Sequence, residues 1–152
     1  MEKIDTGTDH LLFEKGDGVA VLTMNRPEAR NAMSGEMNEA MRATLSSVEV
    51  DPEIRCVVLT GAGKGFCAGG DVKGMAASGD GTVGENTIDS AIHRQRIHQR
   101  ATSGKLFKMP KPTIAALPGA AAGAGIEYSE VDYITSNVDL AYSKQSPVAP
   151  AT

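Results

Sequence analysis

Apolar residues gather in short runs near the start of the chain. Residues 10–14 and 19–24 are rich in aliphatic side chains, and residues 16–18 form a Gly-Asp-Gly turn between them. This turn chemistry accepts a positive φ, so the pattern predicts a β-hairpin. Pro27 ends the second strand because it has no N–H to donate to a ladder and restricts the residue before it.

A helix is predicted after the hairpin. Ser34 is a suitable N-cap, and the Asp-Pro pair at 51–52 breaks the pattern at the other end. Between them, apolar residues recur at three- and four-residue spacing on one face: Met33, Met37, Ala40, Met41, Leu45 and Val48. The unbroken apolar run at 56–59 then predicts a strand covered on both faces.

The second half of the chain carries weaker patterns. We predict a short helix over 71–77, a mobile surface loop over 78–85, which holds three glycines, and a looser helix over 88–107. A second short buried strand is predicted over 113–117, since prolines stand on both sides of it. Beyond Glu127 the pattern fades, with short strands predicted over 132–136 and 139–143.

Each predicted buried strand is followed by a glycine-rich turn, at 61–70 and at 119–125. A helix that starts after such a turn presents N–H groups without intrahelical partners and a positive dipole end. Two of them together form a donor pair for a developing oxyanion, and small residues at Gly70 and Ala124 leave room for a ligand carbonyl. The alternative, that the glycines serve only tight turns, stays open.

An ordered set of motifs carries a resemblance to a known family. The motifs are Asn25-Arg26-Pro27, Asn31-Ala32, Leu59-Thr60-Gly61, Phe66-Cys67-Ala68-Gly69-Gly70-Asp71, Lys111-Pro112-Thr113-Ile114-Ala115-Ala116 and Gly119-Ala120-Ala121-Ala122-Gly123-Ala124-Gly125. In order and spacing they resemble the enoyl-CoA hydratase/isomerase (crotonase) family. The resemblance implies an α/β fold built as a spiral of ββα units, an acyl-CoA thioester ligand, no metal or redox cofactor, and a homotrimer or hexamer.

Site residues follow from the same resemblance. The oxyanion hole corresponds to the backbone N–H groups of Gly70 and Ala124, and Glu127 matches a catalytic glutamate of the hydratases. Glu127 also lies about one helical turn after Ala124, within reach of the carbons beside the carbonyl. The coenzyme A loop corresponds to Ala29, Arg30 and Ala32; Ala68 and Val72 flank the pantetheine path, and Asp71 is assigned to the same binding region.

Departures from the family pattern leave two hypotheses. Residues 126–132 are more polar than the apolar helix usual there, no residue matches the second catalytic acid, and the usual C-terminal helical region is missing. The first hypothesis is an enzyme that hydrates a 2-enoyl-CoA, with double-bond isomerisation close behind. The second is a catalytically incomplete relative that binds an acyl-CoA or a full-length partner without turnover.

Composition and charge exclude further classes of protein. Fifteen Lys and Arg against nineteen Asp and Glu give a net charge of −4, and without a basic cluster nucleic acid is not an expected partner. Two cysteines are too few for a disulfide framework, and no apolar stretch reaches the roughly 18 residues of a membrane span. We expect a single domain over 1–152 in the cytoplasm.

Other binding motifs are poorly supported. Histidines at 10, 93 and 98 are scattered, and neither cysteine has a ligand partner at metal-site spacing, so no metal site is predicted. Residues 63–68 formally match a G-x-G-x-x-A nucleotide-binding pattern. The two glycines that follow, at 69 and 70, oppose the helix this pattern requires, so the match carries little weight.

Overall fold

The computed structural model describes residues 1–71, 88–129 and 131–136. Its elements are β1 (Glu2–Ile4), β2 (Leu11–Gly16), β3 (Val19–Met24), η1 (Pro27–Ala29), α1 (Gly35–Val50), β4 (Cys56–Gly61), α3 (Ile88–Ala101), α4 (Ser103–Phe107), β5 (Thr113–Leu117), α5 (Ala124–Glu127) and β6 (Tyr133–Ser136). The predicted helix over 71–77, loop over 78–85 and strand over 139–143 lie outside the described residues, except for Asp71.

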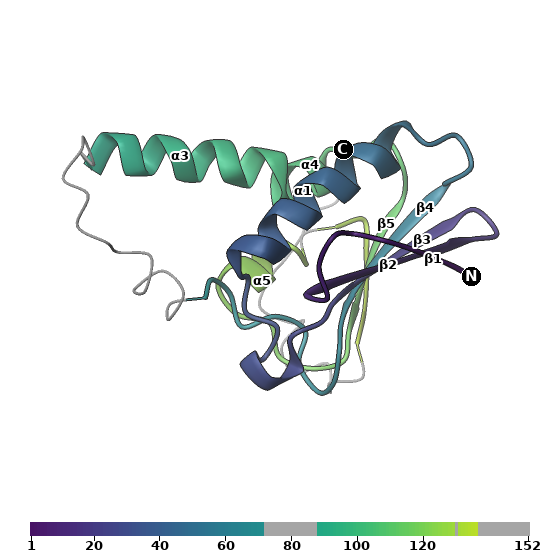
Figure 1. Cartoon of the computed structure of the whole chain (residues 1–152), viewed down its shortest axis with the longest axis horizontal. Helices are drawn as coiled ribbons and strands as arrows, with labels where there is room; N and C mark the ends of the chain where they lie inside the picture. The colour runs from purple at the N-terminus through teal and green to yellow at the C-terminus, as the bar shows by residue number, and fades with distance from the viewer. Residues whose placement is uncertain (72–87, 130, 137–152) are drawn as a thin grey trace, which may run out of the picture.

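The described strands form one sheet in chain order, from β1 at one edge to β6 (Figure 1). β2 and β3 pair antiparallel through a turn in which Asp17 and Gly18 have φ of 54° and 84°, so the predicted hairpin is confirmed. β1 adds an antiparallel strand that the sequence pattern did not predict. From β3 onward each pair is parallel, because helical crossovers return the chain to the same end of the sheet.

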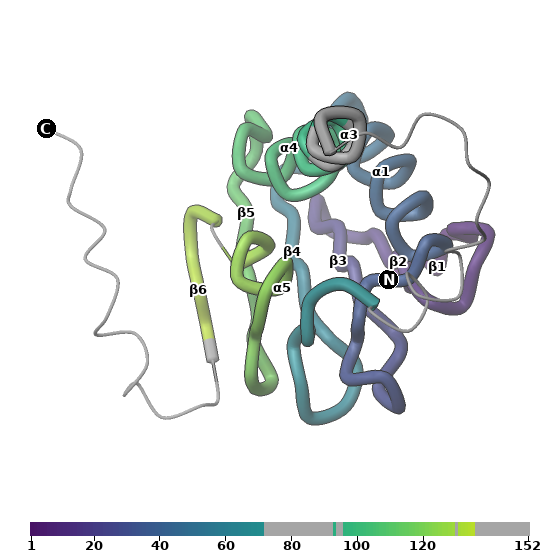
Figure 2. The backbone as a smooth tube through the Cα atoms, turned by 90° about the vertical axis from the view of Figure 1, so that its left-hand side faces the viewer, coloured from purple at the N-terminus to yellow at the C-terminus, as the bar shows by residue number. Residues whose placement is uncertain are grey.

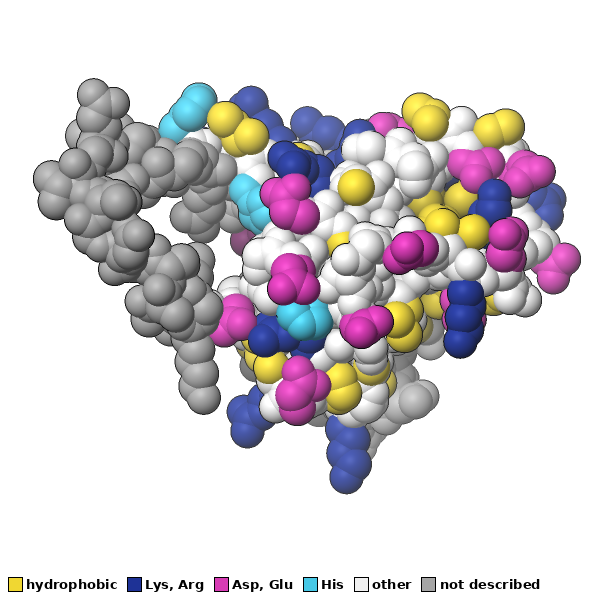
Figure 3. Space-filling view, viewed as in Figure 1, with side chains coloured by type: hydrophobic (Ala, Val, Ile, Leu, Met, Phe, Trp, Pro, Cys, Tyr) yellow, Lys and Arg dark blue, Asp and Glu magenta, His cyan; other side chains and the backbone are white. Residues whose placement is uncertain are grey.

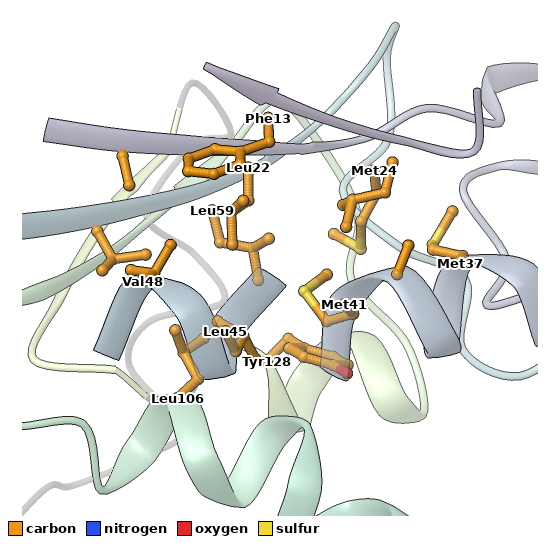
Figure 4. Close-up of a cluster of buried hydrophobic side chains, with 14 of the residues drawn as sticks. Phe13, Leu22, Met24, Met37, Met41, Leu45, Val48, Leu59, Leu106 and Tyr128 are labelled. Atoms are coloured by element: carbon orange, nitrogen blue, oxygen red, sulfur yellow. The ribbon is translucent and has the colours of Figure 1, made fainter. Parts of the chain in front are cut away.

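Helix α1 follows its prediction closely. The Ser34 side chain accepts a hydrogen bond from the Met37 N–H at 3.1 Å, which caps the helix start. All the predicted core residues of its apolar face are buried. Figure 4 shows this face against the sheet, with Met41 near Tyr128 of the segment after α5 and Leu45 near Leu106 of α4.

Burial of the parallel strands differs from the prediction. Along β4, Val57 and Leu59 are buried, whereas Val58 between them is partly exposed. The expectation of a strand covered on both faces is therefore wrong. The reason is that α1, α3 and α4 lie on one side of the sheet, to the left of the strands in Figure 1 and toward the viewer in Figure 2, and the described residues leave the other face partly exposed.

The single helix predicted over 88–107 is also corrected, since the chain forms α3 and α4 with a break at Thr102. Thr102 has φ −120° and ψ −97°, is buried, and donates its hydroxyl proton to the His98 carbonyl at 2.8 Å. A threonine that bonds back to the preceding turn competes with regular helix geometry. After the break, Lys105 of α4 pairs with Glu49 of α1, and Ser103 donates a hydrogen bond to Glu127 of α5.

Candidate functional site

The two glycine-rich turns lie side by side in the structure. Cys67 of the first turn and Ala121 of the second form a parallel bridge, and the Ala122 N–H donates to the Cys67 carbonyl at 2.9 Å. Gly69 has φ 97°, and a Cβ built on it would lie 3.4 Å from the Ala124 nitrogen. A side chain at Gly69 would therefore touch the start of α5, so the two turns pass close to each other here.

Two backbone N–H groups, those of Gly70 and Ala124, lie next to this junction. Met33 exchanges hydrogen bonds with Gly69 and Asp71, at 2.8 and 3.2 Å, so the N–H of Gly70 faces away from Met33. Ala124 is the first residue of α5, where an N–H has no intrahelical acceptor. Neither the Gly70 nor the Ala124 N–H donates a backbone hydrogen bond within the described chain.

Glu127, the last residue of α5, faces helices α3 and α4. Its Oε1 accepts a hydrogen bond from Gln99 Nε2, and its Oε2 accepts one from Ser103 Oγ, both at 3.3 Å. The carboxylate forms part of the wall of a cavity of about 330 Å³. The other lining residues are Arg96, Gln99, Arg100, Ser103, Gly104 and Phe107.

Asp71 takes part in an ion pair next to Gly70. Arg26 donates to the Asp71 carboxylate at 2.9 Å and to the Ala32 carbonyl at 2.8 Å. Side-chain exposures of 16% for Arg26 and 20% for Asp71 mean that solvent screens the pair only in part. Asp71 therefore helps to hold the loop that carries Gly70.

The predicted coenzyme A loop is joined to the first glycine-rich turn. Ala29 ends η1, Arg30 follows with φ 53°, and its carbonyl accepts a hydrogen bond from the Ala68 N–H at 3.0 Å. Arg30 and Ala68 are exposed, and Ala32 is half-buried. These predicted site residues are brought together, whereas Val72 lies outside the described residues.

Sequence reasoning missed the structural role of Asn31. This side chain is fully buried and has φ 56°. Its Nδ2 donates to the carbonyls of Ala62 at 2.9 Å and Gly65 at 2.8 Å, while its Oδ1 accepts from the Arg26 N–H at 2.8 Å. The available signal was an asparagine, which tolerates the left-handed region, within a loop of small residues.

Two weakly acidic side chains are buried behind the junction. Burial raises the pKa of the Cys67 thiol and the pKa of the Tyr128 phenol, so both groups are held neutral near pH 7. A neutral, buried thiol is a poor nucleophile. Among the described residues, no three His, Cys, Asp or Glu side chains are grouped closely enough to hold a metal ion.

The fold and the junction define a class of protein in which a mixed sheet, covered by helices on one side, brings two glycine-rich turns into contact. Residues 14–145 match the enoyl-CoA hydratase/isomerase family, and the chain belongs to this family. A crystal structure of an enoyl-CoA hydratase/isomerase from Marinobacter aquaeolei superposes with a TM-score of 0.75 at 34% identity. The predicted crotonase-like α/β fold is thereby confirmed.

Relatives with assigned names are similar over most of this chain. A 1,2-epoxyphenylacetyl-CoA isomerase from Escherichia coli is 42% identical over 117 residues, which are 77% of this chain and 43% of the relative. An enoyl-CoA hydratase from Mycobacterium tuberculosis is 38% identical over 133 residues, 84% of this chain and 45% of the relative. For the Marinobacter structure the shares are 85% and 49%. The chain thus spans about half the length of the proteins it matches.

Surface properties add two observations. Acidic and basic side chains are interspersed over the described part of the face in Figure 3. None of the described helices combines the length and hydropathy required to cross a bilayer.

Proposed function

We propose that this chain binds an acyl-coenzyme A thioester and stabilises its enolate between the N–H groups of Gly70 and Ala124. The observation that carries the proposal is the contact of the two glycine-rich turns, since each turn bears an N–H for which no backbone acceptor is found among the described residues. Family membership supports the choice of ligand, since the relatives are named as isomerases and hydratases of CoA thioesters.

The proposed chemistry begins at the thioester oxygen. As the thioester becomes enolate-like, negative charge grows on this oxygen, and two fixed donors bind the charged form more strongly than the ground state. Because backbone donors are already in position, little free energy is lost to their reorientation when the charge develops on the oxygen. Neither a metal ion nor a redox cofactor is needed for this step in the proposed scheme.

Glu127 is proposed as the acid–base group, because its carboxylate lies on the cavity wall a short distance along α5 from Ala124. In hydration of a 2-enoyl-CoA, the carboxylate takes a proton from water as the water oxygen bonds to Cβ. The electron pair of the double bond moves toward the thioester oxygen, and Cα then takes from the Glu127 carboxyl the proton that came from the water, which returns Glu127 to its carboxylate form. This remains the leading reaction.

Double-bond isomerisation is the second candidate. Among the described residues that line the cavity, Glu127 is the one with a carboxylate. One carboxylate suffices for isomerisation, since it removes a proton from one carbon and returns it to another. Hydration uses a second acid in the related hydratases, and none is assigned in this chain.

Coenzyme A is proposed to lie along the loop that follows β3. Ala29, Arg30 and Ala32 would contact the nucleotide end, with Ala68, Asp71 and Val72 beside the pantetheine. The hydrogen bond between the Ala68 N–H and the Arg30 carbonyl supports this arrangement, because it joins the two segments next to Gly70. Trimeric or hexameric assembly and a cytoplasmic location stay predictions.

The acid–base role is tested with crotonyl-CoA and with a 3-enoyl-CoA. Loss of the conjugated thioester absorbance reports hydration, and gain of it reports isomerisation. We expect Glu127→Gln to reduce kcat by about 10²- to 10⁴-fold. Glu39→Gln is the matched control, since Glu39 pairs with Arg42 on the exposed face of α1. Equal turnover by wild type and Glu127→Gln would remove Glu127 from the mechanism.

The oxyanion hole is tested by removing one donor. Ala124→Pro deletes the N–H at the first position of α5, where proline is tolerated, and should reduce kcat about 10²- to 10³-fold. Gly35→Pro makes the same change at the start of α1 and should leave kcat unchanged. Calorimetry with acetyl-CoA runs in parallel. Binding without turnover would support the catalytically incomplete relative, and absence of binding would overturn the whole proposal.

A further inference from the structure

Helices α3 and α4 contribute two hydrogen-bond donors to the carboxylate of α5. Gln99 lies in the last turn of α3 and Ser103 begins α4, and each donates to a different oxygen of Glu127, at 3.3 Å. Both donors also line the cavity of about 330 Å³ of which Glu127 forms part. Hydrogen bonds from α3 and α4 therefore hold the Glu127 carboxylate at the edge of this cavity.

We propose that Gln99 and Ser103 are positioning residues for Glu127, an inference that rests on the proposed function. Two hydrogen bonds on different oxygens fix the rotation of the carboxylate plane, which one hydrogen bond leaves free. An ionised carboxylate has about four acceptor sites, so two remain for a water molecule or a substrate proton. The pair thus orients Glu127 without using up its capacity to act.

The two donors contribute unequally. Ser103 Oγ has a single proton and also lies 3.5 Å from the Gln99 carbonyl, so this proton is shared between two acceptors. Gln99 Nε2 carries two protons and donates one of them to Glu127. Loss of the Gln99 amide should therefore disturb the carboxylate more than loss of the Ser103 hydroxyl.

Gln99 and Ser103 are four residues apart, a spacing that sets two side chains on the same face of a helix, so one short stretch of chain reaches both carboxylate oxygens. Between them Thr102 leaves helical geometry and donates its hydroxyl proton to the His98 carbonyl at 2.8 Å.

Steady-state kinetics test the inference. We expect Gln99→Leu to reduce kcat about 10-fold, with KM within about twofold of wild type, and Ser103→Ala to reduce kcat by less. Ser103→Thr retains the hydroxyl and should restore most of kcat. Ser46→Ala is the matched control, because Ser46 bonds to the Arg42 carbonyl on an exposed part of α1. Wild-type kcat in Gln99→Leu, alongside a strong loss in Glu127→Gln, would overturn this inference alone.

A spectroscopic measurement keeps the inference testable whatever the turnover. The side-chain amide signals of Gln99, assigned in a ¹⁵N–¹H spectrum by their loss in Gln99→Leu, should shift when Glu127 is replaced in Glu127→Leu. The same signals should not move in Glu39→Gln. Unchanged Gln99 signals in Glu127→Leu would overturn the positioning role, whereas wild-type turnover in Glu127→Gln would overturn the proposed function beneath it.

Discussion

Replacement of Asn31 provides a demanding test of how the site loops are held. Its amide bonds three backbone groups at 2.8 to 2.9 Å, and these groups belong to Arg26, Ala62 and Gly65. The side chain is fully buried, so water cannot replace these bonds in the native state without entering the loop. Asn31→Ala therefore leaves one N–H and two carbonyls without their partner.

The magnitude follows from these contacts. Each hydrogen bond contributes about 0.5–1.5 kcal/mol net, so three contribute about 1.5–4.5 kcal/mol. Alanine must also adopt the left-handed conformation of φ 56°, which costs about 1–2 kcal/mol for residues other than glycine, asparagine and aspartate. The free energy of unfolding should therefore fall by about 2.5–6.5 kcal/mol. Asn31→Asp should also be destabilising, since its carboxylate would face two carbonyl oxygens.

Urea unfolding followed by far-ultraviolet circular dichroism measures the loss, since the chain has no tryptophan for a fluorescence assay. Asn38→Ala on α1 is the matched control and should change the free energy by less than about 0.5 kcal/mol. A loss below about 1 kcal/mol in Asn31→Ala would refute the reasoning. It would mean that the loop relaxes and satisfies the three backbone groups in another way.

Three further predictions concern buried groups. Because burial raises the pKa of the Cys67 thiol, a smaller fraction of it is thiolate at a given pH. Iodoacetamide should therefore label Cys67 much more slowly than half-buried Cys56, as measured by mass spectrometry, and the two rates should converge in guanidinium. No hydrogen bond of good geometry to the buried Tyr128 hydroxyl is found among the described residues, so Tyr128→Phe should leave thermal stability unchanged or higher, and a loss above about 1 kcal/mol would contradict this. Lys111 donates to the Val48 and Asp51 carbonyls at the end of α1, each at 2.6 Å, so Lys111→Met should destabilise the protein by about 1–3 kcal/mol in urea unfolding, and no change would contradict it.

Local patterns were sufficient for most elements of this fold. The hairpin, helix α1 and strands β4, β5 and β6 were predictable because each depends on periodicity or turn chemistry within a few residues. β1 spans three residues, too few to show alternation. The one-sided burial of β4 depends on which helices cover which part of the sheet, and no local pattern contains that information.

The candidate site was likewise predictable from the sequence only in part. The repeated order of strand, glycine-rich turn and helix start pointed to Gly70 and Ala124, and the structure sets the two turns in contact. The partners of Glu127 could not be predicted, because Gln99 and Ser103 precede it by 28 and 24 residues and meet it only through tertiary packing. Asn31 was missed because its three partners come from two separate loops.

The glycines of the two turns test the alternative that they serve only tight-turn geometry. Tight-turn geometry accounts for Gly69, whose φ is positive, but Gly119 and Gly125 are not among the positive-φ glycines. A Cβ on Gly119 would lie 1.9 Å from the Lys64 carbonyl oxygen, and one on Gly125 would lie 2.4 Å from that of Cys67. These two glycines are required because the backbones of the turns approach each other too closely for a side chain. Turn formation alone therefore does not explain the glycine pattern, whereas close approach of two backbones does.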